Sequence, residues 1–85
     1  MSKLLVFSVL DAKVGAFARP YFAPSKAAAI RAFGDVARDP AHEVGRHPED
    51  YTLYHVGLFD ELTGQLENGI HDALVTASAC KELAS

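Results

Sequence analysis

The chain has 85 residues, 49% of them hydrophobic, and a formal net charge of −3. This length predicts one domain, 1–85, with a small core, because so short a chain buries only about 60% of its unfolded surface. One cysteine excludes an intramolecular disulfide and a cysteine metal cluster, and no apolar run approaches the ~18 residues of a membrane span. A marginal monomer favours a homodimer, and we expect no membrane partner.

The first elements predict a hairpin. Residues 3–10 are rich in Leu, Val and Phe, which indicates a strand buried on both faces. Residues 11–15 carry turn chemistry, and residues 16–22 predict a second strand that pairs back on the first. Pro20 cannot donate a hydrogen bond to a strand ladder, so this second strand is expected to lie at an edge or to be bulged there.

A helix is predicted over residues 26–38. Ser25 is a candidate N-cap, and Asp39-Pro40 ends the segment because a residue before proline is pushed out of the helical region. The apolar residues recur at helical spacing and form one stripe. They are Ala29, Ile30, Phe33, Val36 and Ala37. Residues 40–50 are polar and are predicted to form a loop.

The second half predicts another hairpin. Residues 51–59 are aromatic and β-branched, residues 60–64 form a turn in which Gly64 can take a positive φ, and residues 65–67 return as a short strand. From Asp72 onward an Ala-rich pattern predicts a short C-terminal helix. The expected fold is α+β: an antiparallel sheet of about four strands, in the order β-β-α-β-β, packed by one main helix.

No catalytic machinery is evident in the sequence. Cys80 has no histidine close to it in sequence, the four histidines lack HExxH spacing, and no glycine-rich phosphate loop is present. We therefore expect no enzyme activity, no catalytic residues, no cofactor and no metal. His42 and His47, with Glu43 and Glu49 nearby, leave a loop metal site open, although solvated loop side chains are far commoner.

The candidate binding residues lie around the first hairpin. Phe17, Arg19 and Tyr21 alternate along the predicted second strand, so they are expected to share one face. Aromatic rings on which bases stack and a cation for the backbone suit single-stranded DNA. The full candidate set is Lys13, Phe17, Arg19, Tyr21, Lys26 and Arg31. The alternative is that the two aromatic residues lie in the core or a dimer interface and that Arg19 snorkels.

Charge is unevenly spread along the chain. Residues 1–46 carry a net charge of +3 and residues 47–85 a net charge of −6. A basic excess is the usual mark of a nucleic-acid-binding domain, and here only the N-terminal half shows it. The acidic half suits the rival hypothesis, a protein–protein module in which it meets a basic partner or mimics the charge of DNA.

Several runs carry a resemblance to a known family. Residues 5–17 and 20–35, and then residues 47–54 with 57–60 and 63–64, resemble the small nonstructural protein of the gokushoviruses, which are Microviridae phages with single-stranded DNA genomes. The resemblance covers residues 3–68. It implies a phage protein of the host bacterial cytoplasm, without a catalytic set.

The resemblance also implies a role. Such proteins are associated with DNA, so it implies binding of single-stranded DNA or help in the switch to single-stranded genome synthesis. The alternative is a module that regulates the phage replication initiator or a host replication factor. A packaging component is a weaker third possibility, because packaging peptides of such phages are typically strongly basic.

Overall fold

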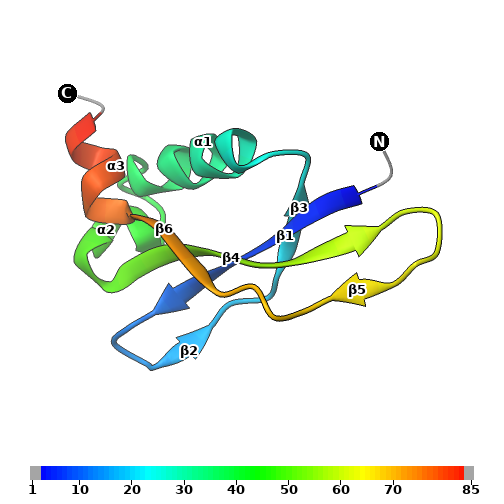
Figure 1. Cartoon of the computed structure of the whole chain (residues 1–85). Helices are drawn as coiled ribbons and strands as arrows, with labels where there is room; N and C mark the ends of the chain where they lie inside the picture. The colour runs from blue at the N-terminus through cyan, green and yellow to red at the C-terminus, as the bar shows by residue number, and fades with distance from the viewer. Residues whose placement is uncertain (1–2, 84–85) are drawn as a thin grey trace.

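The computed structural model describes residues 3–83. A twisted sheet forms one layer of the molecule, and the helices gather on one side of it (Figure 1). In chain order the elements are β1 (Lys3–Asp11), β2 (Ala16–Phe17), β3 (Tyr21–Ala23), α1 (Lys26–Ala37), α2 (Glu43–Arg46), the 3-10 turn η1 (Pro48–Asp50), β4 (Tyr51–Asp60), β5 (Leu66–Glu67), β6 (Asp72–Thr76) and α3 (Ala77–Leu83).

The two long strands form the centre of the sheet. β1 runs antiparallel to β4, from Lys3 opposite Asp60 to Asp11 opposite Tyr51. β2 and β3 pair with the outer edge of β1, and β5 and β6 pair with the outer edge of β4. All five pairings are antiparallel, so the predicted α+β class is confirmed, with six strands in the described residues instead of about four.

The predicted second strand is divided into β2 and β3. Phe17 lies opposite Leu10, and Tyr21 lies opposite Phe7. Phe17 and Tyr21 are four residues apart, whereas their partners Leu10 and Phe7 are three apart. One residue between β2 and β3 therefore has no partner on β1, as in a β-bulge. Pro20 lies in this interruption, which confirms the expectation of a bulged edge.

Two other segments differ from the prediction. Residues 40–50, predicted as a loop, contain α2 and η1. The C-terminal helix does not begin near Asp72, because Asp72–Thr76 is the edge strand β6 and α3 begins at Ala77. The pairing of β6 with β4 decides its conformation, and strand preference depends strongly on such tertiary partners.

The core lies between the sheet and the helices. Ser25 caps α1, since its side chain accepts a hydrogen bond from the Ala28 N–H at 3.1 Å. The helix therefore begins where the sequence predicted. Its apolar side packs on the sheet, and α2 and α3 lie together at one end of the same layer, where the Lys81 ammonium donates to the Gly45 carbonyl at 3.2 Å (Figure 1). The core residues are Phe7, Ala23, Ala29, Phe33, Ala37, Val44, Leu53, Ala77 and Cys80.

The opposite face of the sheet carries no helix in the described part of the chain (Figure 1). Side chains alternate along a strand, so the neighbours of the buried Phe7 and Leu53 point to this open face. Phe17 and Phe22 are the most exposed rings there, at 43% and 47%. Within residues 3–83, no helix has the length and hydropathy to span a membrane.

Candidate functional site

A pocket of about 520 Å³ lies between the β1–β2 hairpin and the helices α1 and α2. Its walls are mainly apolar. Small-molecule sites typically measure about 300–1,000 Å³ and have apolar walls with a few polar groups. The pocket is lined by Val9, Asp11, Val14, Ala16, Phe17, Ala18, Arg19, Tyr21, Phe33, Val36, His42, Glu43, Val44 and Tyr51.

The hairpin that forms one side of the pocket is held in place by its turn. A carboxylate oxygen of Asp11 accepts a hydrogen bond from the Lys13 N–H at 3.0 Å, and Gly15 adopts a φ of +79°. The Ala12 N–H donates to the Asp50 carbonyl at 2.8 Å, which fastens the turn to η1. Asp11 therefore has a structural role, although it lines the pocket.

The aromatic wall is built by β3 and α1. The Tyr21 ring lies 5.9 Å from the Phe7 ring, centroid to centroid, and its hydroxyl donates to the Ala29 carbonyl at 3.4 Å. Burial raises the pKa of this hydroxyl, which further favours the protonated form that donates the hydrogen bond. Phe33 is buried behind it. This wall is fixed by the core and offers ring surface to a ligand.

The opposite wall is α2. His42 caps this helix, because its Nδ1 accepts a hydrogen bond from the Val44 N–H at 3.1 Å. Gly45 allows the helix to approach the end of α1: a Cβ at this position would lie 1.9 Å from the Asp39 carbonyl oxygen. The width of the pocket therefore depends on a residue without a side chain.

We expect Gly45→Ala to displace α2 and to destabilise the protein by more than about 1 kcal/mol, since the contact is with backbone atoms that cannot turn aside. Thermal unfolding followed by circular dichroism measures the loss. Gly64→Ala is a useful comparison, because its Cβ would meet nothing within 4 Å and its cost comes from the positive φ alone. Equal costs for both variants would contradict the close approach.

The structure brings half of the predicted binding residues together. Phe17, Arg19 and Tyr21 all line the pocket. The prediction that they share one strand face is wrong, because the unpaired residue between β2 and β3 puts Phe17 and Tyr21 on opposite faces. Both residues line the same pocket because the chain is interrupted between β2 and β3. Alternation along one strand does not explain their common position.

The other three predicted residues are cations at different places. Lys13 lies in the hairpin turn next to the pocket and lines a smaller one beside it. Lys26 is exposed at the start of α1. Arg31 lines a shallow depression on α1 itself, together with Asp35. Lys26 and Arg31 are therefore outside the lining of the candidate pocket.

The smaller pocket, of about 210 Å³, is acidic. Asp11, Glu43 and Asp50 line it together with Lys13 and Tyr51. Burial, followed by the negative charges of Asp11 and Glu43, raises the pKa of the Tyr51 hydroxyl. This end of the molecule therefore carries a concentrated negative charge.

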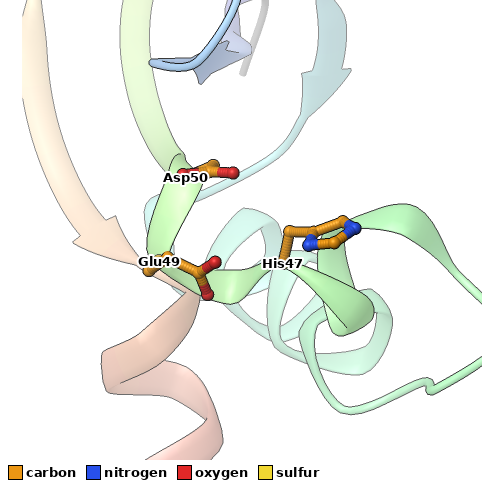
Figure 2. Close-up of side chains that lie close together, drawn as sticks. All are labelled: His47, Glu49 and Asp50. Atoms are coloured by element: carbon orange, nitrogen blue, oxygen red, sulfur yellow. The ribbon is translucent and has the colours of Figure 1, made fainter.

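A neighbouring group of side chains has metal-ligand chemistry. Atoms of His47, Glu49 and Asp50 that can bind a metal lie within 4.8 Å of one another at η1 (Figure 2). His42, which the sequence placed in the same candidate site, instead caps α2. Two of the three side chains are exposed, and such exposed groups are common without a bound ion, so we assign no metal to them.

The sequence did not predict an aromatic group on the open face of the sheet. The Phe17 ring lies 5.1 Å from the Tyr54 ring and 5.5 Å from the His71 ring. At the other end of the same face, the rings of Phe22 and Phe59 are 5.4 Å apart. The contributing strands are far apart in sequence, so spacing along the chain gave no signal of these contacts.

Comparison with known proteins places this chain in a family of small phage proteins. The chain matches the family described as phage ORF5 protein over residues 4–80, from β1 into α3. It therefore belongs to the phage ORF5 protein family. No curated protein and no solved structure matches it. The phage part of the sequence-based resemblance is thus confirmed, and the match extends beyond residue 68, where that resemblance ended.

Proposed function

We propose that this phage protein is a non-enzymatic binder of single-stranded DNA, and that the pocket between the β1–β2 hairpin and α1–α2 receives the DNA. The observation that carries the proposal is the joint lining of one apolar pocket by Phe17, Arg19 and Tyr21. Ring faces take bases of any sequence, and a cation takes the backbone. Arg19 is the only Lys or Arg among the residues that line the pocket.

The charges define what kind of binding this is. Arg19 and the nearby Lys13 are available for phosphates, whereas Asp11 and Glu43 repel them from the other end of the pocket. With a net charge of −3, the chain cannot rely on general electrostatic attraction. Affinity must come mainly from stacking and burial of bases, at about 1–3 kcal/mol per stacked base.

This binding fits the role implied by the resemblance to the gokushovirus protein. A protein that holds unpaired bases in the cytoplasm of the host bacterium would aid synthesis of a single-stranded genome, or the switch to it. Stacking without base-specific hydrogen bonds suits such a role, because a genome-length strand presents every sequence.

The test is an equilibrium titration of a fluorescent single-stranded oligonucleotide at several salt concentrations. If Arg19 and Lys13 each neutralise one phosphate, the logarithm of the association constant should fall with the logarithm of the salt concentration, with a slope of about −1.4. We also expect weaker binding to a duplex, in which the bases are already stacked. No binding at low salt, or stronger binding to the duplex, would sink the proposal.

A second candidate function rests on the acidic pocket. Asp11, Glu43 and Asp50 together suit a basic segment of a partner protein, for which a phage replication initiator or a host replication factor is the candidate. Capture of such a partner from infected cells after nuclease treatment, and loss of capture in Glu43→Gln, would favour this function. Capture that nuclease abolishes would instead favour DNA binding.

A further inference from the structure

We infer that the open face of the sheet is the interface of a homodimer in which two sheets pack face to face. The paired positions that point to this face come from all six strands. They are Leu4, Val6, Ser8, Leu10, Phe17, Phe22, Thr52, Tyr54, Gly57, Phe59, Leu66, Ala73 and Thr76. The two proposals use different sides of the sheet, because the DNA pocket lies on the helix side, and they share only Phe17, which lines that pocket while its ring contacts Tyr54 on the open face.

The composition of this face is the first argument. None of these paired positions holds Asp, Glu, Lys or Arg. An antiparallel sheet with one face in water normally alternates apolar residues inward and polar residues outward. Here the second face is uncharged; Val6 and Ser8 on it are already buried within the chain, whereas Phe22 and Leu66 remain 47% and 66% exposed. Such a face requires a cover.

The size of the molecule is the second argument. Its accessible surface is 5425 Å², whereas a compact monomer of this mass exposes about 4,900 Å². Its radius of gyration is 13.2 Å, against about 12 Å for a compact domain of this length. The protein alone therefore exposes about a tenth more surface than a compact monomer of its mass, and a partner on the open face would cover that excess.

A second copy of the chain, which presents the same face, is the partner that suits the open face best. Single-stranded DNA would need a cation for its phosphates, and these positions provide none. A charged partner would leave its own charges unpaired on the apolar surface. A second copy brings an equally uncharged face, so the net charge of −3 per chain causes no repulsion inside the contact.

The dimensions suit a dimer. The face is four strands wide. At standard strand spacings it measures about 30 Å by about 19 Å, or about 570 Å² per partner, which is smaller than a standard interface of about 800 Å² per partner but exceeds the total of about 1,000 Å² that a specific contact needs. Two sheets can stack about 10 Å apart with interdigitating side chains, as in a β-sandwich. In such a dimer, the main contacts at one end of the interface would come from Phe22, Phe59 and Leu66.

Sedimentation velocity over a wide range of protein concentration tests the inference. We expect a monomer–dimer equilibrium, and we expect Phe22→Lys and Leu66→Lys each to raise the dissociation constant about tenfold or more. Ala28→Lys, an equal charge change at an exposed position of α1 outside the DNA pocket, should leave it unchanged.

Circular dichroism shows whether each variant is folded, and Leu66→Lys is the safer of the two because this side chain is largely exposed in the monomer. A monomer at every concentration would overturn the inference. So would a dimer that both lysine variants leave intact, since that dimer would use an edge strand or a helix. Oligonucleotide binding by the monomeric variants shows separately whether the DNA proposal stands.

Discussion

Phe7→Ala should remove a large part of the stability of this protein. Phe7 is fully buried, and its ring lies 5.9 Å from the Tyr21 ring and 5.2 Å from the His55 ring. Replacing a buried phenylalanine by alanine costs about 3–5 kcal/mol, because the lost burial adds to the cost of a cavity. A domain of this length has a total of about 4–13 kcal/mol, so the variant loses at least about a quarter of it and unfolds outright if the total is at the lower end.

Urea unfolding followed by circular dichroism measures this loss. Leu62→Ala is the matched control, since Leu62 is 83% exposed and surface substitutions usually change stability by less than about 0.5 kcal/mol. A loss below about 1 kcal/mol for Phe7→Ala would mean that the sheet and α1 do not pack as described. Tyr21 rests against Phe7, so a partly folded variant should also bind DNA poorly.

Arg19→Ala should weaken binding of single-stranded DNA about tenfold or more. A charge-assisted hydrogen bond is worth about 1.5–3 kcal/mol, and each 1.4 kcal/mol corresponds to a factor of ten in affinity. Loss of one phosphate contact should also reduce the magnitude of the salt slope by about 0.7. Arg19 is exposed, so its removal should leave the fold intact.

Arg31→Ala is the control for this experiment. It removes the same charge from the same half of the chain, but Arg31 lies on α1 in a depression outside the pocket. The two variants therefore separate a local contact from a general effect of net charge. If both weaken binding equally, the DNA does not use the pocket.

The elements with strong local signals were predictable from the sequence. The first strand, α1 with its cap at Ser25 and the β4–β5 turn all form where the sequence placed them, and Gly64 has the expected positive φ of 75°. In each of these segments, hydrophobic spacing, capping or turn chemistry acts over a few neighbouring residues.

The remaining features depend on contacts between distant segments. β6 is a strand because β4 offers it a free edge, and nothing local distinguishes it from a weak helix. The unpaired residue beside Pro20 changes the face to which Tyr21 points. A prediction that assumes regular alternation along one strand does not include such an extra residue. The pocket needs residues from both halves of the chain, so Phe33, Val44 and Tyr51 could not be assigned to it beforehand.

An amide chemical-shift titration with a short single-stranded oligonucleotide tests the central claim most directly. Binding in the pocket predicts the largest changes at residues 14–21 in the hairpin and at residues 42–44 at the start of α2. Residues 26–31 of α1 should change little. Changes confined to residues 26–31, or to residues of β4 and β5 that point to the open face, would contradict the assignment of the pocket to DNA.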